Sequence, residues 1–99
     1  MLNINKTIDG DNLCVALAGR LDTATSPQLE EELKSALDGI STLVMDFKEL
    51  EYISSAGLRV LLSAQKLMSE RGGMKVTNVN EVIMEIFEVT GFTDILTIE

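Results

Sequence analysis

The order of apolar and polar positions at the start of the chain predicts two strands. Along residues 2–8, apolar side chains fall mostly on alternate positions, a pattern typical of a strand with one exposed face. Residues 13–18 form a continuous apolar run, and the Asp9-Gly10 pair between the two segments favours a tight turn. We therefore predict an antiparallel hairpin whose second strand is the more deeply buried.

An apolar stripe at helical spacing follows this hairpin. The side chains that share it are Leu29, Leu33, Ala36 and Leu37. We expect Ser26 to be the N-cap, because a serine hydroxyl can accept a hydrogen bond from a free amide at the helix start. Pro27 would be the first helical residue, where its missing amide hydrogen costs nothing. The pair Asp38-Gly39 is predicted to end the helix.

Two later segments have the same helical period. The second predicted helix runs from Ser55 to about Arg71 and stops at the Gly72-Gly73 pair. Its apolar arc consists of Leu58, Val60, Leu61, Leu62, Ala64, Leu67 and Met68. The third predicted helix is capped by Asn80 and ends at Gly91. Its inward side chains are predicted to be Val82, Ile83, Ile86 and Phe87.

The segments between the helices have the composition of strands. Residues 42–47 are apolar and rich in strand formers, and we expect them to be buried on both faces, as most parallel strands are. Residues 48–54 are predicted to be a loop, and residues 74–79 alternate like a strand. Residues 95–98 would form a last edge strand or a packed terminal tail.

This element order predicts a single α/β domain over residues 1–99. The order is strand, strand, helix, strand, helix, strand, helix, with a possible final strand. Strands that alternate with helices are joined by right-handed crossovers and lie parallel to one another. We expect a small mixed, mostly parallel sheet with the first strand as an antiparallel edge.

Composition narrows the chemistry open to this domain. The chain has no histidine, which excludes a Ser-His-Asp triad, a Cys-His pair and a histidine-based zinc site. Cys14 is the single cysteine, so it can form neither an internal disulfide nor a cysteine cluster. We expect no catalytic residue, no metal site and no cofactor.

Charge and hydropathy narrow the list of partners. The 16 acidic and 8 basic side chains give a formal net charge of −8, which argues against binding to nucleic acid or to an anionic membrane surface. The first residues do not resemble a signal peptide, and no run approaches the ~18 apolar residues of a membrane span. We expect a protein of the cytoplasm.

Two polar segments stand where sites usually lie in this class of fold. Residues 19–25 follow the second predicted strand, and residues 48–55 follow the third. The carboxyl ends of parallel strands lie at one rim of the sheet, where α/β proteins tend to place their ligands. We therefore predict that the two segments lie side by side.

The second polar segment leads directly into a helix. Ser54 or Ser55 would be the N-cap, and Gly57 in the first turn indicates a place where another group approaches closely. A hydroxyl at a helix N-terminus is a favourable position for a phosphate, because free amides and the helix dipole stabilise negative charge there. Arg59 follows Ser55 by one helical turn and could reach such a phosphate.

These same residues resemble a known family. Residues 46–62, which read DFKELEYISSAGLRVLL, are similar to the signature of STAS domains, specifically of bacterial anti-sigma factor antagonists. Residues 19–25, GRLDTAT, match the earlier motif of that family. The resemblance covers nearly the whole chain in the order and length of its elements, and the family's architecture agrees with the predicted one.

The resemblance implies that the protein takes part in partner switching during transcription regulation. In that family the unmodified antagonist binds an anti-sigma factor that is also a serine kinase, and the sigma factor is released. The kinase then phosphorylates the antagonist, and a serine phosphatase resets the cycle.

The family's acceptor serine maps onto Ser55. Ser54 is the alternative, because many members have aspartate where this chain has Ser54. The partner-binding residues implied are Asp22, Thr23, Thr25, Ser54, Ser55, Ala56, Gly57 and Arg59.

Two other functional classes are alternatives to this one. STAS domains also serve as interaction modules in stress-signalling complexes and lipid-transport ATPase assemblies, without a phosphorylation switch. An enzyme would need a base for Ser55, and the nearest lysine in sequence, Lys48, lies seven residues away in the predicted loop. The Gly-x-Ser-x-Gly elbow of hydrolases is absent, so catalysis is not expected.

Overall fold

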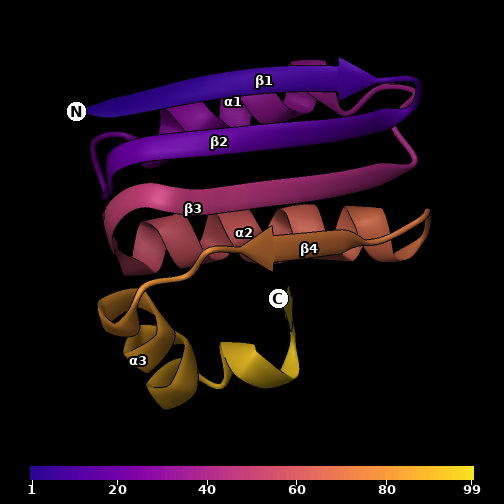
Figure 1. Ribbon diagram of the computed structural model, residues 1–99. Helices are drawn as coiled ribbons and strands as arrows, with labels where there is room; N and C mark the ends of the chain where they lie inside the picture. Colours follow the sequence, from indigo (N-terminus) through magenta and orange to yellow (C-terminus); the bar gives the residue numbers. More distant parts are fainter.

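The computed structural model describes residues 1–99 and has a five-stranded sheet with helices between the strands (Figure 1). The elements in chain order are β1 (Leu2–Asp9), β2 (Asn12–Leu21), α1 (Ser26–Ala36), β3 (Thr42–Ile53), α2 (Ser55–Ser69), β4 (Met74–Thr77), α3 (Glu81–Thr90), the 3₁₀ helix η1 (Phe92–Asp94) and β5 (Thr97–Ile98). The strand order is β1-β2-β3-β4-β5, with β1 antiparallel to β2 and all other pairs parallel. The predicted mixed α/β fold and its antiparallel edge are confirmed, and of the two alternatives for residues 95–98 the structure has a short edge strand, β5.

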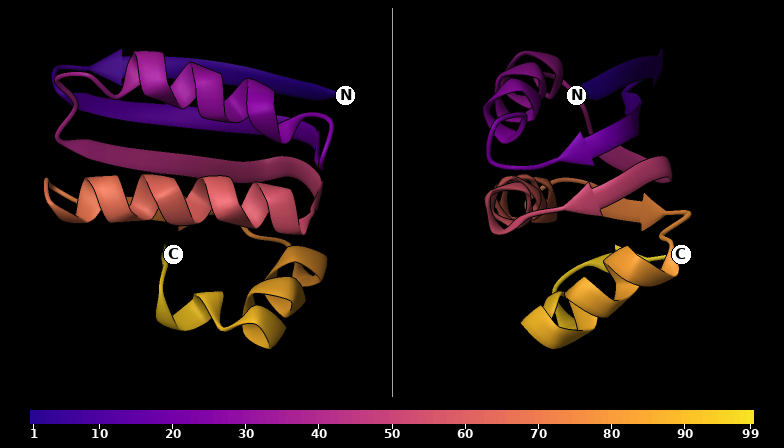
Figure 2. Two further views of the ribbon diagram at one scale, coloured as in Figure 1. Left: turned by 180° about the vertical axis from the view of Figure 1, so that it is seen from behind. Right: turned by 90° about the vertical axis from the view of Figure 1, so that its left-hand side faces the viewer.

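Helices α1 and α2 lie on the same face of the sheet (Figure 2). The crossovers from β2 to β3 and from β3 to β4 each move one strand further in the same direction across the sheet. Because such crossovers are right-handed, both helices must lie on the same face of the sheet. Leu43, Met45 and Phe47 on that side of β3 are buried, whereas Val44 and Asp46 on the other side are partly exposed. The prediction that residues 42–47 are buried on both faces is therefore wrong.

A single hydrophobic core lies between the sheet and the helices. It contains 24 buried apolar residues, and the Phe47 and Phe87 rings join β3 to α3 with centroids 6.4 Å apart. On α3, Ile83 and Phe87 are buried and Ile86 is partly buried, as predicted. Val82 is 57% exposed, so its predicted inward position is wrong. Helix α3 lies at the margin of the sheet (Figure 1), and only Ile83 and Phe87 of this helix are buried.

The ends of the helices follow the predicted signals, with shifts of a few residues. The N-cap of α1 is Thr25, not Ser26. Ser26 is buried as the first helical residue, and its hydroxyl donates a 2.5 Å hydrogen bond to the Asp22 carbonyl. Asn80 caps α3 as predicted, accepting from the Ile83 amide at 2.9 Å, and Gly91 ends that helix at φ +81°.

Strands β2 and β3 continue beyond the predicted ends. Residues 19–21 belong to β2, and residues 48–53 belong to β3, so the prediction of a loop over residues 48–54 is wrong. The β2–β3 register shifts twice, and each time β3 contains one extra residue. Such bulges bend a strand and increase its twist, and the end of β3 curls toward the start of α2 (Figure 1).

No helix in the structure is long and apolar enough to cross a membrane.

Candidate functional site

The two serines at the start of α2 have different roles. Ser54 is the N-cap in an extended conformation, and its hydroxyl oxygen accepts a 3.4 Å hydrogen bond from the Gly57 amide. Ser55 is the first helical residue, and its exposed side chain makes no hydrogen bond within the protein. The sequence left open which serine caps the helix, and the structure assigns the cap to Ser54 and a free hydroxyl to Ser55.

The ends of β2 and β3 bring the two polar segments together. Leu21 is paired with Ile53, and the Ser54 amide donates a 2.8 Å hydrogen bond to the Leu21 carbonyl. The predicted side-by-side placement of the segments is confirmed. At the same rim the Arg20 guanidinium lies 4.6 Å from the centre of the Tyr52 ring, a contact that sequence reasoning did not single out.

Asp22 and Thr25 hold the β2–α1 turn in shape through their own hydrogen bonds. The Asp22 carboxylate accepts from the amides of Ala24 at 3.0 Å and Thr25 at 3.1 Å. The Thr25 hydroxyl accepts from the Asp22 amide at 2.9 Å and donates to the Arg20 carbonyl at 2.8 Å. The Thr25 backbone amide is the main cause of a lowered Asp22 pKa.

Thr23 occupies the tip of this turn and is exposed. Asp22, Thr23 and Thr25 are the predicted partner-binding residues of this turn. The polar groups of Asp22 and Thr25 are engaged within the turn, so Thr23 is the one of the three whose side chain faces outward.

Gly57 lies where α2 meets the sheet. A Cβ atom at this position would be 2.8 Å from Cγ1 of Ile53 and 2.8 Å from Cγ of Leu21. Gly57 is itself buried, so the close approach indicated by the sequence is made inside the protein, by the sheet. The missing side chain sets how near the first turn of α2 comes to β2 and β3.

A shallow groove runs from the β2–α1 turn along the first two turns of α2. It is lined by Thr23, Ser26, Pro27, Glu30, Ala56, Arg59 and Val60. Arg59 is exposed and forms no ion pair within the chain. Thr23, Ala56 and Arg59, which were predicted from two distant segments, therefore meet in one groove beside Ser55.

The site has the chemistry of a surface that is modified or bound. No group of three or more His, Cys, Asp or Glu side chains is arranged to hold a metal ion. The first-turn amides of a helix lack intrahelical partners, and they make the end of α2 electropositive. An exposed hydroxyl at that end is a suitable acceptor for a phosphoryl group.

Comparison with known proteins places the chain in a family. A family model described as "Mlab, STAS domain" matches residues 4–97. BtrV of Bordetella bronchiseptica, assigned as an anti-sigma factor antagonist, is 40% identical over 93 residues, which cover 92% of this chain and 79% of BtrV. The anti-sigma-B factor antagonist of Bacillus subtilis is 29% identical over 98 residues, covering 98% of this chain and 90% of that protein.

Solved structures agree with this placement at the level of the fold. An anti-sigma factor antagonist from Mycobacterium paratuberculosis superposes with a TM-score of 0.89 at 20% identity, over 99% of this chain and 85% of that one. The unphosphorylated form of the anti-sigma factor antagonist SpoIIAA has a TM-score of 0.75 at 15% identity, over 100% and 87% of the two chains. The chain belongs to the STAS domain family and, within that family, to the anti-sigma factor antagonists.

Proposed function

We propose that the unmodified protein binds an anti-sigma factor that is a serine kinase, and that phosphorylation of Ser55 ends this binding. The observation that carries the proposal is the free, exposed hydroxyl of Ser55 at the first position of α2. The phosphorylated form of SpoIIAA superposes on this chain with a TM-score of 0.74. SpoIIAA therefore has this fold and exists in both a phosphorylated and an unphosphorylated form.

Ser55 is a better acceptor than Ser54 for a geometric reason. The Ser54 oxygen already accepts from the Gly57 amide, and Ser54 is only partly exposed. A phosphate on Ser54 would displace the cap, and loss of a cap costs about 1 kcal/mol of helix stability. Ser55 can be modified without loss of any hydrogen bond within the chain.

The phosphate would oppose docking and leave the helix intact. It adds about −1.5 to −2 charge at pH 7, and the N-terminal end of α2 stabilises that charge locally. Arg59 lies one turn further along α2, within reach of a charge-assisted hydrogen bond to a group on Ser55. In a close interface the added bulk and the cost of removing water from the phosphate both weaken binding.

The docking surface would contain Thr23, Ser55, Ala56 and Arg59 at its centre. Asp22 and Thr25 hold the neighbouring turn in shape, and Gly57 sets the position of the helix. A serine phosphatase would restore the binding form by removing the phosphate. The protein itself would supply an acceptor hydroxyl, while the partner supplies ATP and the catalytic groups.

Phosphosite mapping after incubation with candidate anti-sigma kinases and ATP tests the acceptor. We expect one phosphate, located on Ser55, in the wild type and in Ser54→Ala, and none in Ser55→Ala. Phosphate on Ser54 in the wild type would transfer the acceptor role to that residue.

Binding assays test the switch itself. Ser55→Ala should bind the kinase and stay bound when ATP is added, while Ser55→Asp should bind weakly. Ser35→Asp, an exposed serine on α1 away from the groove, is the control for added charge and should bind like the wild type. Equal affinity of the wild type, Ser55→Ala and Ser55→Asp would contradict the switch and favour an interaction module without phosphorylation.

A further inference from the structure

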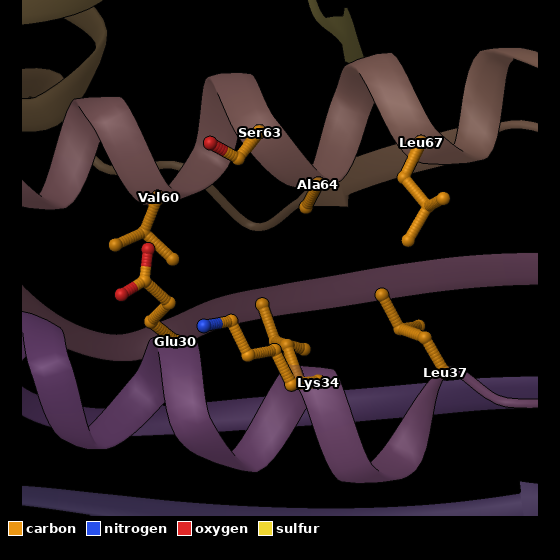
Figure 3. Close-up of a pocket in the computed structure, with 8 residues that line it drawn as sticks. Glu30, Lys34, Leu37, Val60, Ser63, Ala64 and Leu67 are labelled. Carbon is orange, nitrogen blue, oxygen red and sulfur yellow. The ribbon is translucent and has the colours of Figure 1, made fainter.

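An apolar depression between α1 and α2 is not used by the switch described above. Its lining residues are Glu30, Leu33, Lys34, Leu37, Val60, Ser63, Ala64 and Leu67, which we call the α1–α2 trough. Leu37 and Leu67 point toward one another from the two helices, and Glu30 and Lys34 lie along the α1 side (Figure 3). Leu67 is 40% exposed, although it is a large apolar residue, and it lies opposite Leu37 at the end of the trough away from Val60 (Figure 3).

The trough continues directly from the groove beside Ser55. Glu30 and Val60 line both depressions, so a single furrow runs from Thr23 and Arg59 to Leu37 and Leu67. A partner seated over Ser55 would therefore have the apolar trough as the next surface along the same two helices.

The dimensions of the trough fit one helix of a partner. Val60 and Leu67 are seven residues apart on α2, which corresponds to about 10 Å along the helix axis. Apolar side chains three or four residues apart on a second helix are roughly 5–6 Å apart, so two of them can enter this length. Helices laid in grooves of this kind present their apolar face to the groove.

The charged residues that line the trough indicate which side chains of a partner helix would lie beside its apolar ones. Glu30 lies at the end of the trough nearest Ser55, Lys34 lies one turn further along α1, and the chain as a whole has a net charge of −8. A basic side chain on the partner helix would complement Glu30 at this end.

We propose that the α1–α2 trough receives an amphipathic helix of the anti-sigma kinase, with two apolar side chains along the length from Val60 to Leu67 and a basic side chain at Glu30. This inference rests on the proposed function and names a second contact for the same partner. The switch serine controls one end of the interface, and the trough supplies apolar affinity at the other.

The test compares affinities for the kinase that binds the wild-type chain. Leu67→Asp should weaken binding by more than tenfold, because a carboxylate would have to lose its water inside the apolar contact. Val89→Asp is the matched control: Val89 is 79% exposed on α3, beyond β4, and this variant should bind within twofold of the wild type. Far-ultraviolet circular dichroism checks that both variants remain folded.

A second pair of variants tests the predicted charge. Glu30→Gln should weaken binding severalfold and reduce its dependence on salt concentration, while Glu31→Gln, an exposed neighbour outside the trough, should change neither.

Three outcomes would overturn the inference. Wild-type affinity in Leu67→Asp, with binding still lost in Ser55→Asp, would leave the switch valid and remove the trough from the interface. A wild-type dimer that Leu67→Asp dissociates without a change in kinase affinity would assign the trough to a second copy of the chain. Failure of the wild type to bind any anti-sigma kinase would remove the proposed function and this inference with it.

Discussion

At Gly57 the absence of one methyl group determines how closely α2 packs on the sheet. A Cβ atom there would lie 2.8 Å from side-chain atoms of Leu21 and Ile53, both of which are buried. Overpacking a core costs about 1–3 kcal/mol, while alanine gains about 1 kcal/mol over glycine in helix propensity. We therefore expect Gly57→Ala to lower the free energy of unfolding by about 1 kcal/mol in a urea titration.

The exposed residue Ser63 on the same helix provides the control for that measurement. Ser63→Ala makes a smaller gain in propensity, about 0.5 kcal/mol, without a core contact, so it should match or slightly exceed the stability of the wild type. A Gly57→Ala protein as stable as Ser63→Ala would show that Leu21 and Ile53 yield without cost.

Two aspartates link stability to pH. Hydrogen bonds lower the pKa of Asp22, chiefly from the Thr25 amide, and that of Asp46, chiefly from the Asn78 side chain. A carboxyl group whose pKa is lower in the folded state stabilises the protein above its ordinary pKa of 3.8, and this contribution is lost as pH falls through the folded value. We expect the free energy of unfolding to fall below about pH 4.

Substitution separates these two groups from general acid effects. Asp22→Asn and Asp46→Asn should each lower stability at neutral pH and flatten the fall below pH 4, because the substituted side chain no longer titrates. Asp38→Asn, an exposed residue without a hydrogen bond, should keep the wild-type profile in urea titrations between about pH 3 and pH 7. Unchanged profiles in the first two variants would contradict the assignment.

At the scale of elements, the pattern of the chain was sufficient for the order and type of the three helices and the first four strands, but it did not predict the 3₁₀ helix η1. Helix spacing, the Asn80 cap and the Gly91 stop all have local causes, and the structure has these elements where they were predicted. The end of β3 could not be predicted in this way. Residues 48–51 include three charged side chains, yet Leu50 and Ile53 enter the core, and the bulges that allow this depend on pairing with β2.

The candidate site was predictable only as far as it depends on local sequence and on the arrangement of parallel strands. The serine pair, the turn and their proximity follow from local sequence and from parallel strands meeting at one rim. The choice of Ser54 as the cap depends on where β3 ends, and the close approach at Gly57 depends on Leu21, more than thirty residues away in the chain. The α1–α2 trough joins residues of two helices and has no signal in either one alone.

The β4–α3 connection offers a test at this scale. The Asn80 side chain caps α3 at the Ile83 amide and also donates a 2.9 Å hydrogen bond to the Leu50 carbonyl of β3. Asn80→Ala loses both bonds, whereas Asn80→Asp keeps the cap and loses the donor to Leu50. We expect losses in unfolding free energy of about 2 kcal/mol for alanine and about 1 kcal/mol for aspartate in urea titrations. Equal losses in the two variants would contradict the expected difference between losing both hydrogen bonds and losing only the one to the Leu50 carbonyl.

For the whole molecule, the direction in which the strands are added has a functional consequence. All the crossovers from β2 to β4 move the same way, so α1 and α2 lie next to each other on one face (Figure 2). The start of α2, the β2–α1 turn and the α1–α2 trough therefore belong to one continuous side of the protein. A partner can contact the modified serine and an apolar surface at once without any change in the fold.

This arrangement predicts that phosphorylation acts on binding and leaves the fold unchanged. A dianionic phosphate on Ser55 brings the formal charge of −8 to about −10, and this added repulsion disfavours the compact state slightly. The N-terminus of α2 attracts the phosphate and so stabilises the folded state by about 0.3–1 kcal/mol. In a domain of this size 1 kcal/mol shifts the melting temperature by about 4–8 °C. The two effects oppose each other, so the phosphorylated protein should have the same far-ultraviolet circular dichroism and melt within about 5 °C of the unmodified form. A large loss of helical signal on phosphorylation would mean that the switch works by unfolding α2 instead.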